Sequence, residues 1–306
     1  MFNKSDVLNP FKVFALDNFD VKNYRDSLIK YLANTSFSKP QYQVVILAAG
    51  KGSRMEINYP KMLYKLNYPW GKSSILANTM RMIDYLRSTV NIYKTHLVIN
   101  KKDREHYEKQ SINNFVNIIA LDETDIRGTA ICINALKTLL DSDKDIIFIW
   151  GDLALWRASD VNLAVRVKDL INSSISFPTR INHSPYVAFL RSIEGKFIKV
   201  VHSNESKRWN KSAEQDCLSF VCKYESLSKL DDFINKFLSE NKSDNIEVDF
   251  IHYIPYLASK GEVVIGVPVV EKDLIYGLNT VARAEEINKV LSQYTQIEYQ
   301  EYFGLT

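Results

Sequence analysis

The chain has 306 residues, of which 46% are hydrophobic and 25% charged, an ordinary composition for a globular protein with a buried core. Its formal charge of +3 is too small to indicate binding to nucleic acid or to a membrane surface. No secretory signal and no run of about eighteen apolar residues is present, so we expect a cytoplasmic protein without membrane association. Three cysteines without metal spacing indicate reduced thiols.

Residues 1–42 precede the first predicted core strand and form an N-terminal extension. Residues 20–32 place Val21, Tyr24, Leu28 and Leu32 on one stripe, which predicts a short amphipathic helix. We expect this helix to pack on the domain or on a second subunit, in which case the protein would be a homo-oligomer.

The first core strand runs directly into a glycine-rich loop. Val44–Leu47 is a short apolar run rich in β-branched residues, typical of a buried parallel strand. Gly50 and Gly52 can adopt backbone angles closed to other residues and let main-chain N–H groups approach a ligand, while Lys51 and Arg54 add positive charge. The loop is therefore suited to bind phosphate groups.

A third cation follows the loop at Lys61, after a proline that favours an extended entry. The whole pattern resembles the signature of the nucleotidyltransferases that make nucleotide sugars, most of all the bacterial N-acetylglucosamine-1-phosphate uridylyltransferases. The residues that carry the resemblance are Leu47-Ala48-Ala49-Gly50-Lys51-Gly52-Ser53-Arg54-Met55 and Pro60-Lys61. The acetyltransferase domain of the bifunctional members is not expected, because the chain shows no hexapeptide repeat.

The remaining elements predict an α/β fold with a mostly parallel, Rossmann-like sheet covered by helices. Strand and helix patterns alternate up to Asp152, with helices at 74–87 and 128–140 and strands at 96–99, 117–121 and 145–150. The pattern is looser afterwards, and the resemblance implies a smaller antiparallel substrate lobe there. We expect strands at 186–190, 197–201, 218–221 and 262–269 and helices at 231–238 and 282–291. The nucleotidyltransferase domain would span 43–306, with a nucleotide half at 43–152 and a substrate half at 153–306.

The resemblance implies attack by a phosphate oxygen on the α-phosphorus of a nucleoside triphosphate, with release of pyrophosphate. Because the attacking phosphate is already an anion, the protein has to hold two anions together and neutralise their charge. By resemblance, Lys51 and Arg54 would stabilise the triphosphate and the leaving pyrophosphate, and Lys61 would bridge the two reacting phosphates. The expected nucleotide-binding residues are Leu47, Ala48, Ala49, Gly50, Gly52, Ser53, Glu123, Gly128 and Thr129.

Two phosphorylated substrates also call for Mg²⁺, which binds few protein oxygens together with substrate phosphates. Asp152 follows a predicted strand, at the carboxyl end where open α/β sheets bind ligands. The stretch from Gly277 to Thr280 matches the late motif of the resembling family, which makes Asn279 the second expected ligand.

Departures from the family pattern affect the expected specificity. Glu123 stands where the uridylyltransferases read the base with glutamine; a carboxylate suits the amine of cytosine, and the N3–H of uracil would also serve. The tyrosine that contacts the sugar corresponds to Tyr186, followed by valine instead of glycine, and the sugar-binding glutamate corresponds to His202.

The sequence thus predicts a nucleotidyltransferase that joins UTP or CTP to a small phosphorylated substrate, most simply a sugar 1-phosphate. Two alternatives stay open: a cytidylyltransferase that acts on a phosphorylated non-sugar, and a nucleotide-binding regulatory protein without turnover.

Overall fold

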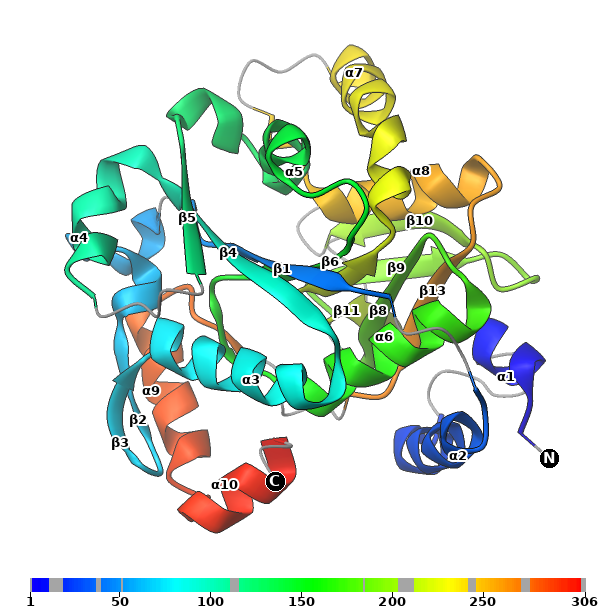
Figure 1. Ribbon diagram of the computed structural model, residues 1–306, viewed down its shortest axis with the longest axis horizontal. Coiled ribbons are helices and arrows are strands. Elements are labelled where there is room, and N and C mark those ends of the chain that lie inside the picture. Colours follow the sequence, from blue (N-terminus) through cyan, green and yellow to red (C-terminus); the bar gives the residue numbers. More distant parts are fainter. Residues whose placement is uncertain are drawn as a thin grey trace.

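The computed structural model describes residues 2–10, 19–36, 40–50, 52–110, 116–183, 185–202, 212–241, 246–270 and 276–303. Within these ranges ten strands form one sheet in the order β10-β9-β11-β8-β12-β6-β1-β4-β5, with β13 beside β8 (Figure 1). Their bounds are β1 Tyr42–Leu47, β4 Ile92–Asn100, β5 Val116–Leu121, β6 Asp145–Trp150, β8 Ile175–Asn182, β9 Val187–Arg191, β10 Phe197–His202, β11 Ala213–Asp216, β12 Ser219–Cys222 and β13 Val264–Pro268.

The sheet is parallel at one end and antiparallel at the other. β1 pairs in parallel with β4 and β6, and β4 pairs in parallel with β5. From β12 to β10 each pair along this order is antiparallel, whereas β13 pairs in parallel with β8. The predicted α/β fold is confirmed, and the antiparallel strands continue the same sheet. Strands of both expected halves share this sheet, and their division near residue 152 stays a prediction.

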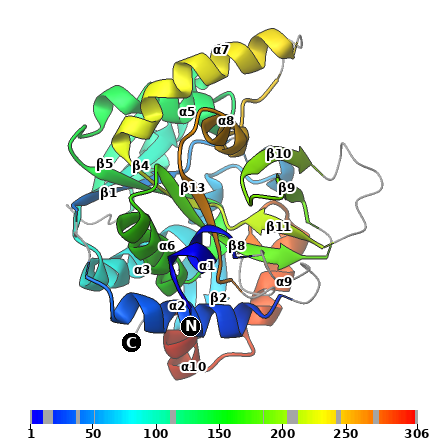
Figure 2. The same ribbon diagram turned by 90° about the vertical axis from the view of Figure 1, so that its right-hand side faces the viewer.

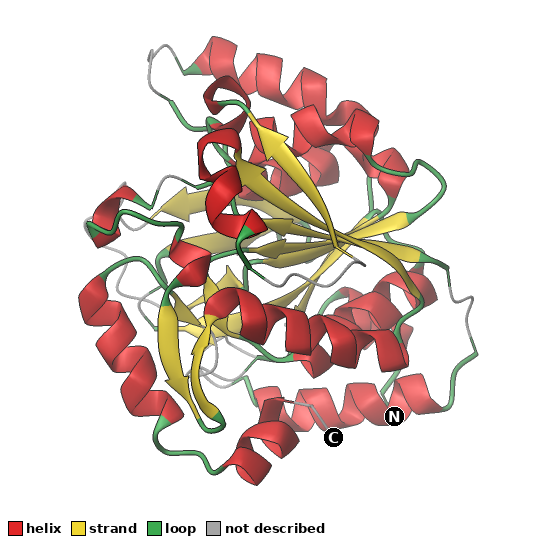
Figure 3. Ribbon diagram, turned by 60° about the vertical axis from the view of Figure 1, so that its left-hand side comes forward, coloured by secondary structure: helices red, strands yellow, loops and turns green. Residues whose placement is uncertain are grey.

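Helices cover both faces of the sheet, as Figure 3 shows. Alternation along β1 sends Val44 and Ile46 to the core beneath α3 (Ile75–Thr89) and α6 (Ala158–Ile171). Val45 points to the core beneath α5 (Thr129–Leu136) and α8 (Tyr253–Ser259). None of the helices within the described ranges is long and apolar enough to cross a membrane. The helices are α1 Lys4–Leu8, α2 Val21–Ala33, α3 Ile75–Thr89, α4 Arg104–Glu108, α5 Thr129–Leu136, α6 Ala158–Ile171, α7 Leu230–Glu240, α8 Tyr253–Ser259, α9 Val281–Leu291 and α10 Gln296–Phe303. The short strands outside the large sheet are β2 Lys65–Tyr68, β3 Gly71–Ser74, β7 Leu153–Leu155 and β14 Tyr276–Gly277.

The predicted N-terminal helix is present as α2, and it packs on the body of the protein beside α6 (Figure 2). Tyr24, Leu28 and Leu32 are buried, as the apolar stripe predicted. The Arg25 guanidinium lies 3.1 Å from the Asp160 carboxylate of α6. The extension therefore contributes to the main core.

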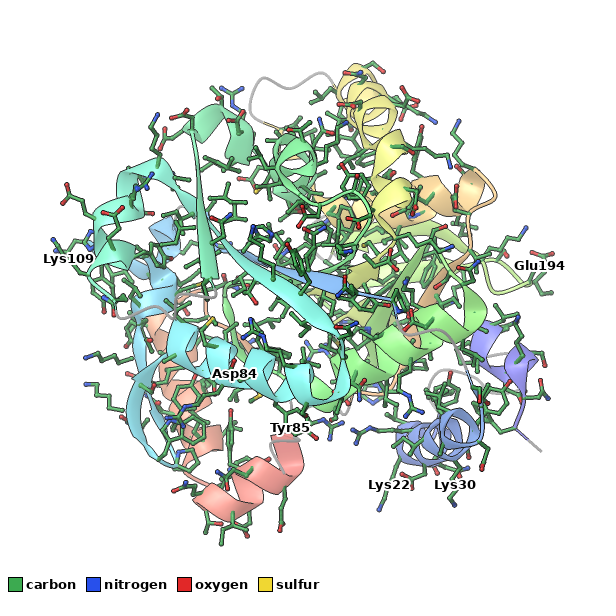
Figure 4. All side chains as sticks on the ribbon, viewed as in Figure 1. Lys22, Lys30, Asp84, Tyr85, Lys109 and Glu194 are labelled. Atoms are coloured by element: carbon green, nitrogen blue, oxygen red, sulfur yellow. The ribbon has the colours of Figure 1, made fainter. Side chains whose placement is uncertain are left out.

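Replacing Leu28 with alanine should lower the free energy of unfolding by about 2–4 kcal/mol, because the side chain is fully buried and its loss leaves a cavity. Urea denaturation measures the change. Lys22 and Lys30 project from the exposed side of the same helix (Figure 4), so their alanine variants are matched controls with changes of about 0.5 kcal/mol or less. A Leu28→Ala protein as stable as the controls would show that α2 is not part of the folded core.

The sequence patterns missed several elements after Asp152, including α6, β8 and β11. β8 contains Pro178, and a proline normally argues against a central strand because it lacks an N–H donor. β12 pairs with β8 only at residues 175–176, and β11 only at residues 179–182. Pro178 therefore lies at the changeover between β12 and β11, where neither of these two strands pairs with it, while it lies opposite Val267 of β13.

Candidate functional site

A cavity of about 310 Å³ lies at the carboxyl ends of β1 and β6. This is the edge where parallel strands of an open α/β sheet present their loops to a ligand. Most of the expected site residues line it: Leu47, Ala48, Ala49, Gly50, Gly52, Arg54, Lys61, Gly128, Thr129, Asp152 and Asn279.

The glycine loop forms one wall of the cavity. Gly52 has a φ of +60°, a left-handed conformation that favours glycine, whereas Gly50 has no such angle. Gly151, which also lines the cavity, donates its N–H to the Leu47 carbonyl at 2.8 Å. A Cβ at this glycine would lie only 2.8 Å from the same oxygen. The ends of β1 and β6 therefore approach closely because residue 151 has no side chain.

Lys61, Asp152 and Asn279 meet in this cavity although they lie far apart in the sequence. The Lys61 Nζ lies 3.2 Å from Asp152 Oδ2 and 3.3 Å from Asn279 Oδ1. Asp152 follows the end of β6, and its carbonyl accepts the Leu278 N–H at 2.7 Å. This backbone hydrogen bond holds residues 277–279 at the edge of the sheet. The Asp152 carboxylate and the Asn279 amide oxygen therefore both face the Lys61 ammonium.

The donors at this place fit Mg²⁺. Asp152 Oδ2 and Asn279 Oδ1 already converge on one positive charge, and Asp152 Oδ1 is buried without a hydrogen-bond partner in the described part of the chain. Carboxylate and amide oxygens are the protein ligands this ion prefers. Among the described residues, no three His, Cys, Asp or Glu side chains are grouped to hold a metal.

The opposite wall is formed by the start of α5 and by residues 246–249. Gly128 has a φ of +99° and lies against the backbone of Val248, whose carbonyl accepts the Ala130 N–H at 2.9 Å. The Thr129 hydroxyl donates to Asp249 Oδ1 at 3.2 Å and accepts the Phe250 N–H at 2.8 Å. Residues 248–250 are thus fixed against the start of α5.

Glu247 and Asp249 line the cavity, and the sequence analysis missed both. A signal was available, since acidic residues at 247 and 249 flank a valine in the alternation of an extended segment with one polar face. The partner of that segment could not be known from the pattern alone.

A second hollow of about 700 Å³ adjoins the first, because Glu247 and Asp249 line both. It contains the two expected substrate residues, Tyr186 and His202, whose rings are perpendicular at 6.0 Å. His252, which the sequence analysis did not single out, lies with its Nε2 3.2 Å from the Nε2 of His202.

Three expected nucleotide-site residues are not among those that line the cavity. Glu123 does not line the cavity: its side chain is 59% exposed and pairs with Lys102 at 3.4 Å. Its proposed contact with the base would require a change of position. Lys51 lies outside the described residues, as does the side chain of Ser53, whose backbone forms a 3₁₀ turn with Arg54 and Met55.

Cys132 is a further residue of the cavity wall. Burial, with a smaller contribution from the Asp125 charge, raises the pKa of its thiol to about 12. The thiol therefore stays protonated and is a poor nucleophile.

Comparison with known proteins finds similar sequences and similar solved structures. No protein-family model matches the chain. The bifunctional protein GlmU of Buchnera aphidicola subsp. Schizaphis graminum is 28% identical over 220 residues, which are 70% of this chain and 44% of GlmU. GlmU of Thermodesulfovibrio yellowstonii is 29% identical over 249 residues, 78% of this chain and 50% of GlmU. The chain therefore spans about half the length of these curated relatives.

Two solved structures share the fold. The inositol-1-phosphate CTP transferase from T. maritima has a TM-score of 0.60 and 16% identity, covering 84% of this chain and 97% of that protein. Apo-UDP-glucose pyrophosphorylase has a TM-score of 0.60 and 13% identity, covering 82% of this chain and 98% of that protein. The resemblance expected from the glycine loop is confirmed by these relatives and by the shared fold.

Proposed function

We propose that the chain is a Mg²⁺-dependent nucleotidyltransferase that couples UTP or CTP to a small phosphorylated substrate, such as a sugar 1-phosphate, and releases pyrophosphate. The observation that carries the proposal is the convergence of Lys61, Asp152 and Asn279 in a cavity that also contains the glycine loop. The names of the two solved structures, a CTP transferase and a UDP-glucose pyrophosphorylase, support the class of reaction.

In the proposed reaction, an oxygen of the acceptor phosphate forms a bond to the α-phosphorus of the nucleoside triphosphate. The bond between the α-phosphorus and the oxygen that bridges to the β-phosphate breaks, and the electron pair leaves on pyrophosphate. Lys61 would hold the acceptor phosphate and the α-phosphate together, which provides orientation and charge neutralisation. Arg54 and Lys51 would stabilise the β- and γ-phosphates.

Asp152 and Asn279 would hold Mg²⁺, and the ion when bound supplies further neutralisation of the phosphate charges. With only two protein ligands, the remaining positions would belong to phosphate oxygens and water. The ammonium of Lys61 lies within 3.3 Å of both proposed ligand oxygens, so this side chain would stay next to the ion and to the phosphates that it would hold.

The hollow that contains Tyr186, His202 and His252 is the proposed site of the acceptor outside its phosphate. Its position supports this assignment, because Glu247 and Asp249 connect it to the nucleotide cavity. Tyr186 is about half exposed and offers a ring face, and the two imidazoles offer hydrogen bonds to hydroxyl groups.

All three cysteines are free, in keeping with the proposed cytoplasmic location.

The first test is thermal stabilisation of the purified chain by UTP, CTP, ATP, GTP and dTTP, each with Mg²⁺. Binding to the native state at about 100 times Kd adds roughly 2.7 kcal/mol of stability. We expect UTP or CTP to raise the melting temperature by about 5 °C and the other nucleotides to have smaller effects. Pyrophosphate release with a panel of sugar 1-phosphates and phosphorylated alcohols then identifies the acceptor.

The pattern of shifts separates the alternatives. A shift with CTP alone, followed by release with a phosphorylated alcohol, would favour a cytidylyltransferase that acts on a non-sugar. A shift without release for any acceptor would favour a regulatory protein. No shift with any nucleotide would contradict the proposed function.

A further inference from the structure

The turn between β11 and β12 is strained and lies beside the proposed metal ligands. Leu218, in this turn, has a φ of +55°, a left-handed conformation that a residue with a Cβ adopts at a cost of about 1–2 kcal/mol. Its side chain lies close to Gly277, since a Cβ at this glycine would lie 3.8 Å from both Leu218 Cδ1 and Asp152 Oδ2. The strained residue therefore lies next to the segment that carries Asn279.

A buried carboxylate holds this conformation. Asp216 is 2% exposed, and its Oδ2 accepts the Leu218 N–H at 3.0 Å, which closes a turn of the kind that aspartate and asparagine form with their own backbone. Burial raises the pKa of this carboxyl to about 6, against the lowering by the Leu218 N–H and the Arg180 charge. Burying a carboxylate costs free energy. The hydrogen bond from the Leu218 N–H offsets part of this cost.

The turn between β11 and β12 also fixes the end of β6. The Leu218 carbonyl accepts the Trp150 N–H at 3.0 Å. On the other side, the Gly151 N–H is bound by the Leu47 carbonyl at 2.8 Å. Asp152 is the next residue, so the backbone before it is held from two neighbouring strands.

We propose that Asp216 is a positioning residue: by holding Leu218 in the left-handed turn, it aligns Trp150 and thereby sets the Asp152 carboxylate against Asn279 for cation binding. The inference rests on the proposed function, because it assigns a cation to this pair. Asp216 lines neither of the two hollows. It acts through two hydrogen bonds, one from the Leu218 N–H to its carboxylate and one from the Trp150 N–H to the Leu218 carbonyl.

Two readouts that do not require turnover test the proposal. Titration with Mn²⁺ followed by electron paramagnetic resonance measures affinity for the ion, and hydrogen exchange measures protection of the Trp150 amide. Asp216→Ala should weaken Mn²⁺ binding about tenfold, as removal of a partner behind a metal ligand typically does. The same variant should speed exchange at residue 150. Asp216→Asn keeps an acceptor oxygen and should stay within about twofold of the wild type for Mn²⁺.

Asp169→Ala is the matched control for loss of a buried carboxylate. Asp169 accepts a hydrogen bond from the hydroxyl of Tyr42, at the opposite end of β1, and burial raises the pKa of its carboxyl too. We expect this variant to lower the melting temperature without changing Mn²⁺ affinity or exchange at Trp150.

Unchanged Mn²⁺ affinity in folded Asp216→Ala would overturn the proposal, as would a wild-type chain that binds no Mn²⁺. An equal loss in Asp169→Ala would also overturn it, because the effect would then be general destabilisation. If Mn²⁺ binding follows the expected order but no pyrophosphate is released by the wild type, the proposed function fails and the positioning role of Asp216 stands.

Discussion

Replacing Lys61 with alanine should lower the rate of pyrophosphate release by about 100- to 1,000-fold, the usual effect of removing a group that stabilises charge in a transition state. Lys61 is the described cation nearest to Asp152 and Asn279, with its Nζ within 3.3 Å of an oxygen on each. Alanine removes the positive charge that would hold two phosphates together. The reduction should appear in kcat under saturating substrate, measured with a coupled pyrophosphate assay.

The fold should survive this change, because the pair with Asp152 is partly exposed and such pairs contribute about 1 kcal/mol or less. The matched control is Lys65→Ala, which removes an exposed lysine of β2 that does not line the cavity. It should release pyrophosphate at the wild-type rate. Turnover in Lys61→Ala equal to that of this control would rule out the role proposed for Lys61.

Gly128→Ala should destabilise the protein by about 3–5 kcal/mol, the combined effect of a left-handed backbone angle and an overpacked contact. The φ of this residue is +99°, and a Cβ would lie 2.5 Å from both the amide nitrogen and the carbonyl oxygen of Val248. Since both colliding atoms are backbone, the segment from Glu247 to Asp249 would have to move away from α5. Urea denaturation measures the stability, and binding of UTP or CTP should weaken with the loss of this wall.

Gly50→Ala is the control for this prediction. Its added Cβ would meet nothing within 4 Å, and its backbone angle is not left-handed, so the free energy of unfolding should change by about 1 kcal/mol or less. If the two alanine variants were equally stable, residues 246–249 would not be packed against α5 in solution as they are here.

The most local features of the protein could be predicted from sequence. A run of β-branched residues predicts the strand Tyr42–Leu47, and the apolar stripe of Tyr24, Leu28 and Leu32 predicts helix α2, because both depend on residues close together in the chain. The left-handed angle of Gly52 follows from the same kind of signal. The family resemblance extended this to residues far along the chain, including Asp152 and Asn279, which line the cavity.

The sequence analysis missed several residues of the candidate site, because their place in it depends on which other segments they pack against. No motif that the sequence analysis recognised contains Glu247, Asp249 or His252. These residues reach the two hollows because residues 247–252 pack beside α5 and β10. Glu123, chosen by alignment, is instead exposed beside Lys102. Alignment gives a position in the chain, and the packing of the loop decides where the side chain lies.

The sequence alone therefore predicted the main strands and helices of the first half, without β2, β3 and α4, and it led to the proposals of a phosphate-binding loop and of a class of reaction. Only the tertiary structure decided which oxygens face Lys61, which stands 91 residues from Asp152 and 218 from Asn279. It also decided that Pro178 sits in a central strand, at a point where β12 has ended and β11 has not begun. The physical reason is the same for both: strand order and backbone pairing bring distant residues together, whereas local propensities act only between neighbours.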